Sequence, residues 1–225
     1  MKKILLLVFF HIIINNVKSQ VEFGVGSIGF SGTDSKNLEL KSALRINLAC
    51  DFFIPVPVTD SLGLLITIEP GIYWDKYYFD QNIIPESTNG HTFLNEDTNP
   101  NHEYRNNLFS YKTLMQSSNI NLPLKIYFPV GKKILGSVGA NVSYMVDGKF
   151  KQKYFTDNEK IINKNSFNFK SNEYNLNRLQ YGLDFSLHYN NFVLFGGYSL
   201  SKVFKENKGP DIHLYVIGLG YTFLF

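Results

Sequence analysis

Three side chains in the carboxyl-terminal part of the chain are of the types that nucleophilic hydrolysis needs. Asp184, Ser186 and His188 occupy positions i, i+2 and i+4, so in a β-strand they would share one face. A serine nucleophile needs a histidine base and an acid that orients the base. Same-face residues of a strand lie about 6.6 Å apart along the backbone, however. We therefore expect these residues to be polar filling of an interior, with a hydrolase as the alternative.

A second group with chemical potential lies in a long polar segment. His91, Glu96, Asp97, His102 and Glu103 include the imidazole and carboxylate groups that bind divalent cations. Their spacing matches no metal-binding loop signature. We therefore expect a solvated loop with no metal, and nothing in the sequence predicts a cofactor.

The elements that must position these residues are β-strands. From Leu38 to Phe52 the even positions are mostly apolar, and the odd positions carry five polar or charged groups. Strands of globular proteins usually have about 5–6 residues, whereas a tilted strand crosses a bilayer with about 9–11. A strand this long, with two such different faces, is typical of the wall of a membrane barrel.

Similar patterns recur along the chain and predict an all-β fold, a transmembrane antiparallel up-and-down β-barrel of about eight strands. Pro70 and Pro123 each remove a backbone donor and are expected at bulges or weak points of pairing. The predicted strands cover residues 20–30, 38–52, 64–78, 118–128, 134–146, 179–189, 192–204 and 212–225.

The connections between these strands alternate in length, as in outer-membrane barrels. Short turns are predicted at residues 55–60, 129–133 and 190–191 on the periplasmic side. The other side carries the segments 31–37, 79–117, 148–173 and 205–210, of which the second and third are long, polar loops. Such loops are where we expect a function that differs between barrels to lie.

The first residues have the pattern of a cleavable signal peptide. A basic start is followed by an apolar run from Ile4 to Ile14, and Ser19–Gln20 offers the cleavage point. The chain then divides into a signal peptide, residues 1–19, and a barrel domain, residues 20–225. The whole chain has 22 basic and 19 acidic residues. Removing Lys2, Lys3 and Lys18 leaves 19 of each, so net charge gives no argument for binding nucleic acid.

Polar residues on the inner faces of the strands have both signs of charge. The interior of an eight-stranded barrel is just wide enough to be filled by side chains. Charges there must pair or keep water, so we expect a structural network that plugs the lumen, with a narrow proton or ion path as the alternative. The predicted members are Glu39, Lys41, Arg45, Asp51, Glu69, Asp75, Lys125, Arg178, Asp184 and His188.

Aromatic residues make up 16% of the chain, which suits the interfacial girdles of a barrel. Trp74 is predicted in such a girdle together with Tyr73, Tyr77 and Tyr78. The single cysteine, Cys50, cannot form an internal disulfide and falls on the predicted lipid face.

The sequence resembles known proteins at two levels. Its end, with Gly220, Phe223 and Phe225, resembles the signal read by the barrel-assembly machinery. The segments FGVGSIGFSG, ITIEPGIYWDK, INLPLKIYF and NRLQYGLDF resemble the PorT-like family of small outer-membrane barrels. Members usually have Glu before the proline of the third segment, where this chain has Asn121 and Leu122. They usually have Asp before the glycine of the fourth segment, where this chain has Gln180 and Tyr181. The resemblance implies an eight-stranded barrel and little about activity, although one branch takes part in protein secretion and gliding.

We therefore expect an integral protein of the outer membrane that reaches it after Sec export and is not an enzyme. Its expected contacts are outer-membrane lipid, the barrel-assembly machinery during biogenesis, and an envelope protein or glycan bound by segments 79–117 and 148–173. The alternatives are a lipid-modifying enzyme, a narrow ion channel and a component of a secretion apparatus.

Overall fold

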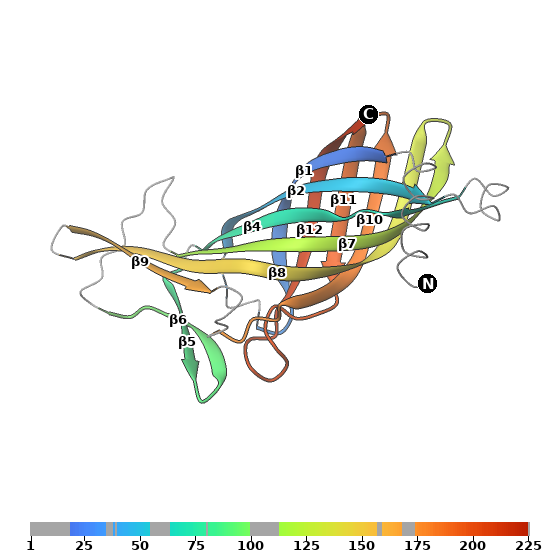
Figure 1. Cartoon of the computed structure of the whole chain (residues 1–225). Helices are drawn as coiled ribbons and strands as arrows, with labels where there is room; N and C mark the ends of the chain where they lie inside the picture. Colours follow the sequence, from blue (N-terminus) through green and yellow to red (C-terminus); the bar gives the residue numbers. More distant parts are fainter. Residues whose placement is uncertain are drawn as a thin grey trace, which may run out of the picture.

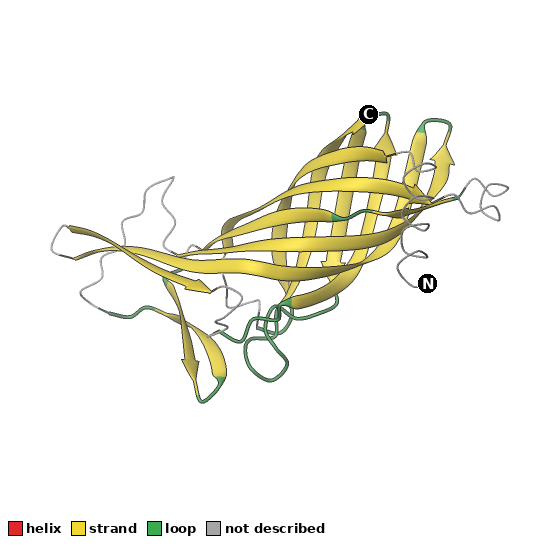
Figure 2. Cartoon of the chain, in the orientation of Figure 1, coloured by secondary structure: helices red, strands yellow, loops and turns green. Residues whose placement is uncertain are grey.

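Strands make up nearly all of the regular structure (Figures 1 and 2). The computed structural model describes residues 19–34, 38, 40–54, 64–79, 81–99, 113–156, 159–167 and 174–224, with the backbone alone at 19, 41, 53–54, 163–167 and 224. No helix in this part of the chain is long and apolar enough to cross a membrane. The strands are β1 (Ser19–Ser31), β2 (Leu40–Ile54), β3 (Leu65–Ile68), β4 (Gly71–Phe79), β5 (Ile83–Thr88), β6 (His91–Glu96), β7 (Thr113–Gly131), β8 (Ile134–Thr156), β9 (Glu159–Phe167), β10 (Leu179–Tyr189), β11 (Phe192–Ser199) and β12 (His213–Leu224).

The main sheet closes on itself as an antiparallel barrel. From β1 the ring runs through β2, the β3–β4 pair, β7, β8, β10, β11 and β12, and β12 pairs with β1 from Gln20↔Leu224 to Ser31↔His213. β3 and β4 follow one another along a single position in the wall, since both pair with β2 and with β7. The ring thus has eight positions, which confirms the predicted fold.

The division between β3 and β4 falls at Glu69–Pro70, where one continuous strand was predicted. Proline has no N–H to donate to the ladder. The Pro70 carbonyl still accepts from the Cys50 N–H at 3.0 Å, and the Glu69 N–H donates to the Pro123 carbonyl at 3.0 Å. Both prolines therefore meet at one interruption of the wall, the weak point of pairing that the sequence predicts.

The outward face of the wall is apolar. On β7, Ile120, Leu122, Leu124 and Ile126 are 44–53% exposed, whereas Lys125 between them is buried inside the barrel. Cys50 is exposed on the outer face, as predicted. A closed antiparallel barrel leaves no sheet edge in lipid, and an apolar exterior band completes its membrane-spanning form. The protein is an integral β-barrel of the outer membrane.

The glycines of the first strand have a packing role. Gly26 pairs with Gly218 of β12, and the ring of Phe195 lies against both. A Cβ atom would stand 2.4 Å from Phe195 Cζ at Gly218 and 2.7 Å from Phe195 Cε1 at Gly24, closer than real contacts allow. The ring therefore packs directly on the backbone of β1 and β12, which explains the Gly-rich opening of the sequence.

The two long segments, predicted as loops, contain ordered β-structure. Segment 79–117 includes the β5–β6 hairpin, turned at Asn89 and Gly90 with φ of 53° and 74°, as in a type I′ turn. Segment 148–173 contains the outer part of β8, which has 23 residues, and its partner β9. Figure 1 shows β8 and β9 leaving the barrel together as a ribbon. The expectation of irregular loops was wrong, because β-pairing continues beyond the membrane.

Two further boundaries differ from the prediction. β11 ends at Ser199 instead of residue 204, because the chain then turns and the Val203 N–H donates to the Ile212 carbonyl at 2.8 Å. The turn predicted at 129–133 is shorter than expected and occupies residues 132–133, because β7 continues to Gly131. The turn predicted at 190–191 is present. Residues 1–18, the predicted turn at 55–60 and residues 35–37 lie outside the described part of the chain, so the signal peptide stays a prediction.

Candidate functional site

The lumen is filled by side chains in three layers that differ in chemistry. The end that holds the start of β1 and the turn between β10 and β11 is periplasmic by the pattern of outer-membrane barrels, since it carries the two-residue turns. There the Thr222 N–H, near the end of β12, donates to the Asn191 carbonyl at 2.9 Å. From this end outward, the lumen contains an acid-rich layer, a layer built around one arginine, and an apolar layer.

The acid-rich layer is organised by Glu69, which is 2% exposed. The Lys125 ammonium pairs with it at 2.5 Å. The Tyr127 hydroxyl and the Thr67 hydroxyl donate to its Oε1 at 2.7 and 2.8 Å. Asp51 lies in the same layer, where its Oδ2 accepts from Gln20 at 2.7 Å. A carboxylate held by one ammonium and two hydroxyls is a satisfied buried ion, which is a structural arrangement.

Ser186 and His188 lie in this layer on the β10 face and are hydrogen-bonded, with 2.7 Å between Oγ and Nε2. Ser186 also contacts the Ser137 hydroxyl at 2.6 Å, and the ring of His188 lies 5.1 Å from that of Tyr127. The two side chains bridge the backbone spacing of same-face residues, so that spacing does not keep this pair apart. Asp184, which would complete a triad, instead accepts from Asn141 at 2.7 Å.

The middle layer is built on Arg45 of β2. Its Nε and Nη2 donate to the two oxygens of Asp75 at 2.7 Å each, and its guanidinium carbon lies 4.0 Å from the centre of the Tyr73 ring. The Tyr77 hydroxyl donates to the same carboxylate at 3.0 Å. Tyr73 and Tyr77 therefore point into the lumen, and the prediction that they join Trp74 in the outer girdle was wrong. Odd and even residues of β4 face opposite sides of the wall, so of these four aromatic residues only Trp74 and Tyr78 lie on the outward side.

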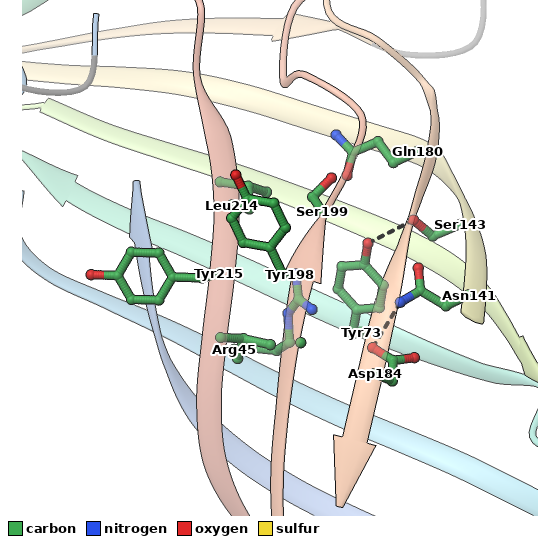
Figure 3. A pocket seen from close by; sticks show the side chains of 12 residues that line it. Arg45, Tyr73, Asn141, Ser143, Gln180, Asp184, Tyr198, Ser199, Leu214 and Tyr215 are labelled. Carbon is green, nitrogen blue, oxygen red and sulfur yellow. Dashed lines mark hydrogen bonds between the residues drawn. The ribbon is translucent and has the colours of Figure 1, made fainter. Parts of the chain in front are cut away.

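Two small cavities remain in the polar layers. Figure 3 shows the first, about 30 Å³, with Tyr73 directed at Ser143 (2.9 Å) and Asn141 directed at Asp184. The second, about 70 Å³, is lined in part by Glu22, Asn47 and Lys125. One buried oxygen each of Glu22 and Asn47 has no hydrogen-bond partner among the described residues. Cavities of this size and polarity suit a few water molecules and no larger ligand.

The outer layer is an apolar plug that closes the mouth of the barrel. The segments that flank β10 and β12 turn into the mouth, where Leu176 pairs with Phe204 and both are 1% exposed. Phe30 stacks on Tyr77 with 5.3 Å between ring centroids. The apolar members are Ile28, Phe79, Ile83, Met115, Met145, Phe150, Tyr174, Leu176, Val203, Phe204, Ile212 and Leu214.

The predicted polar network is therefore present in most of its members. Arg45, Asp51, Glu69, Asp75, Lys125, Asp184 and His188 all face the lumen. Arg178 is half-buried just before β10, and Glu39 and the Lys41 side chain lie outside the described part of the chain. Sequence reasoning missed Glu22, which is 4% exposed, because glycines at 24, 26 and 29 obscure the alternation of β1. Tyr73 and Asn141 were also left out of the predicted network, although their positions in the alternation place them on the inward face of their strands.

The residues that the sequence analysis weighed as possible metal ligands do not converge. His91 and Glu96 are the first and last residues of β6, about 16 Å apart at the usual rise of a strand. The Asp97 carboxylate accepts from Gln152 at 2.9 Å, and His102 and Glu103 lie outside the described residues. In the part of the chain that the structure describes, no three acidic, histidine or cysteine side chains are placed to hold a metal ion.

A groove of about 570 Å³ lies outside the barrel, on top of the plug. The β5–β6 hairpin folds back to form one side, held by the Thr92 N–H, which donates to the Lys208 carbonyl at 2.9 Å. Asn175 donates to the Gly90 carbonyl and to the Thr92 hydroxyl, both at 3.1 Å. The opposite side is tied by the Asp211 N–H, which donates to Asp34 at 2.7 Å.

The lining of this groove mixes apolar and charged groups. Phe93, at 44% exposure, lies beside the His91 ring with 4.6 Å between centroids. Lys202 pairs with Asp211 at 3.2 Å on the other side. An open hollow with an aromatic platform and a few polar groups is the usual form of a binding site. The remaining lining residues are Asp34, Leu38, Thr92, Leu94, Asn95, Asn207, Gly209 and Pro210.

The predicted assembly signal lies at the seam of the barrel. Gly220 is buried opposite Gly24 of β1, and Phe223 is 47% exposed on the outer face of β12. Phe225 lies outside the described residues. Gly220 and Phe223 thus lie on opposite sides of the wall, and the role of the segment as an assembly signal stays a prediction.

Comparison with known proteins finds similarity in architecture alone. No family model matches the chain, and no curated protein matches it in sequence. Among solved structures, Neisserial surface protein A is similar at 10% identity over 92% of this chain and 97% of its own, with a TM-score of 0.43. Ail of Yersinia pestis is similar at 12% identity over 92% and 99%, with a TM-score of 0.36. The outer membrane protease OmpT of Escherichia coli is similar at 10% identity over 93% and 97%, with a TM-score of 0.37.

Proposed function

We propose that this protein is a non-enzymatic binding component of the envelope, which holds a partner protein on the outer end of its barrel. The observation that carries the proposal is the groove of about 570 Å³ between the β5–β6 hairpin and the segment around Asp211. Its walls are fixed by hydrogen bonds between the hairpin and the barrel mouth. A preformed wall lowers the entropy that binding must overcome.

A protein is a better fit than a glycan because open strand edges lie at the same outer end of the barrel as the groove. β9 ends the main sheet, and β5 and β6 form a separate two-stranded sheet. Within the described residues, β9 is paired along one edge only. An extended segment of a partner can add to such an edge through backbone hydrogen bonds. A surface glycan is the alternative occupant, and a role within a larger membrane complex accords with either.

The plug and the polar layers argue against an ion channel and against a lipid-modifying enzyme. An ion path would have to cross the apolar outer layer, in which Leu176 and Phe204 are each 1% exposed. A lipid-modifying site would have to face the leaflet, whereas Ser186 and His188 are buried in the lumen.

We also propose that the chain enters the envelope with a signal peptide of residues 1–19 and belongs with the PorT-like barrels. The basic start and apolar run of the first residues support the signal peptide. The segments FGVGSIGFSG, ITIEPGIYWDK, INLPLKIYF and NRLQYGLDF support the family assignment. A place in a secretion apparatus, as in one branch of that family, is a second candidate role.

Co-purification from native membranes in mild detergent tests the binding role. We expect a stoichiometric partner with wild-type protein, and its loss with Phe93→Ala, because Phe93 is the exposed aromatic of the groove. Phe192→Ala is the matched control, since Phe192 is 66% exposed at the periplasmic end of the barrel. Absence of any partner, or a partner kept by Phe93→Ala and lost by Phe192→Ala, would overturn the proposal.

A further inference from the structure

The outer wall contains a second hollow that the binding role does not use. It has a volume of about 150 Å³ and lies on the lipid side of β4, β7 and β8, near the irregular pairing at Ser118/Asn119. Trp74, 39% exposed, forms its inner rim. Below Trp74 the wall is apolar, with Ile72 on β4 and Ile120 on β7 both exposed. Because tryptophan is enriched where hydrocarbon meets headgroups, this hollow lies at the level of the outer-leaflet headgroups.

Two lysines stand in one row across this hollow. Lys76 of β4 pairs with Gln116 of β7, which pairs with Lys149 of β8. The two lysines are therefore two strands apart, about 9.6 Å, with the amide of Gln116 between them. Lys151 continues the outward face of β8 beyond Lys149. Nothing in the barrel core requires cations here, because this face of the wall is turned away from the lumen.

The charges of this hollow are not neutralised within the described residues. The ion pairs of that part of the chain join Arg45 to Asp75, Lys125 to Glu69, and Asp211 to Lys202 and His213. None of them involves Lys76 or Lys149. Asp147 is the exposed acid of the lining, in the row nearer the membrane with Trp74 and Ser118. Asp75 also lines the hollow, but it is buried and paired with Arg45 on the lumen side. Two cations against one exposed acid leave the hollow positively charged.

We infer that this hollow binds the phosphate-bearing headgroup of a glycolipid of the outer leaflet. Lys76 and Lys149 supply the opposite charge for the phosphate, and Gln116 and Ser118 offer hydrogen-bond donors between them. The apolar wall below Trp74 receives the acyl chains of the same molecule. This combination of a cation pair above an apolar wall favours a lipid over a free anion, because only a lipid uses both.

Lipid retention measures this site directly. Wild-type barrel is incorporated in phosphatidylcholine vesicles that contain diphosphorylated lipid A, and the lipid A that stays with the protein after mild detergent extraction is quantified. For the double variant Lys76→Gln with Lys149→Gln we expect a roughly 30-fold weaker affinity for lipid A. This is the combined effect of two basic residues removed from an anionic surface. Lys132→Gln with Lys133→Gln is the matched control at the periplasmic turn, where both lysines are exposed, and should behave as wild type. Asp147→Asn should strengthen retention.

Two further arms identify the ligand, and folding of each variant is checked by its altered gel migration without boiling. Lipid A without phosphates should be retained as weakly as by the double lysine variant. Inorganic phosphate alone should show no lysine-dependent binding. The inference would be overturned if wild type and the variant at Lys76 and Lys149 retained lipid A equally, or if the control pair lost as much of it. Weaker retention by Asp147→Asn would also overturn it, as would lysine-dependent binding of inorganic phosphate. All four readouts are independent of the groove at Phe93.

Discussion

Arg45 and Asp75 face each other on paired strands and are joined by two parallel hydrogen bonds of 2.7 Å each. Their side chains are 16% and 2% exposed, and the Tyr73 ring covers the guanidinium. A planar donor fork on a carboxylate is the strongest form of side-chain pairing. This pair therefore fixes how β2 and β4 meet at mid-height in the lumen.

Removing one member of that pair should be costly. Asp75→Ala leaves a buried guanidinium without its partner, so we expect a loss of about 3–5 kcal/mol in the free energy of unfolding. Arg45→Met with Asp75→Leu removes both charges and should recover most of the loss. Urea unfolding of the barrel in lipid vesicles measures both. Lys202→Ala breaks a half-exposed pair with Asp211 and should cost no more than about 1 kcal/mol. A similar cost for Asp75→Ala and Lys202→Ala would contradict this assignment.

The Ser186–His188 pair should contribute to stability and not to catalysis. Ser186→Ala leaves His188 and Ser137 without a buried hydrogen-bond partner, for which we expect about 1–3 kcal/mol of destabilisation. The lipid composition of cells that carry Ser186→Ala or His188→Ala should match that of the wild type. Mass spectrometry of extracted phospholipid and lipid A makes the comparison. A modification that is lost while the variant still folds would instead support a lipid-modifying enzyme.

The plugged lumen should not conduct ions. The layer at the mouth is built of buried apolar side chains, among them Leu176 and Phe204, and moving an ion through such a layer is very unfavourable. We expect no steady single-channel current when the protein is added to a planar lipid bilayer. A porin in the same membranes is the positive control. Reproducible current steps from pure, folded protein would show that the plug opens.

The β5–β6 hairpin should depend on the backbone freedom of Gly90. Its φ of 74° is unfavourable for residues with a Cβ atom, although no atom lies within 4 Å of that Cβ position. We therefore expect Gly90→Ala to weaken the hairpin by about 1–2 kcal/mol through strain alone. Gly131 also has no atom near its Cβ position and has no positive φ, so Gly131→Ala is the control and should be tolerated. Hydrogen exchange of residues 83–96 reports the difference, and equal protection in both variants would count against the turn assignment.

The barrel could be predicted from the sequence because each wall strand must place apolar groups in lipid at every second residue. Leu44 to Phe52 shows this pattern, and the structure places Arg45, Asp51 and Cys50 on the predicted sides. Leu38 and Leu40 instead pack against the plug, before the irregular pairing at Leu40/Ser42. Pro70 and Pro123 were informative on their own, since a missing N–H disturbs pairing wherever a proline stands.

The parts that could not be predicted lie where this constraint ends. Beyond the membrane no face of a strand meets lipid, so the outer half of β8 lacks the apolar outward face of a wall strand. Its lysines at 149, 151 and 153 made the segment resemble a polar loop, although Phe150 packs into the plug. The Asn89-Gly90 pair was the available signal for the β5–β6 hairpin, because this dipeptide favours a type I′ turn. The apolar plug depends on where residues 200–212 turn back into the mouth, which is a matter of tertiary packing. The groove could not be seen in advance for the same reason.

The 23-residue course of β8 has a mechanical consequence. One strand passes without a break from the periplasmic turn, through the membrane, into the ribbon outside (Figure 1). Its hydrogen bonds to β7 extend from Gly131 to Thr113 and run across the direction in which the ribbon would be pulled. A load applied to the tip is therefore carried in shear, by many bonds at once. The force that the ribbon can resist is therefore set by the β7–β8 hydrogen bonds within the wall of the barrel.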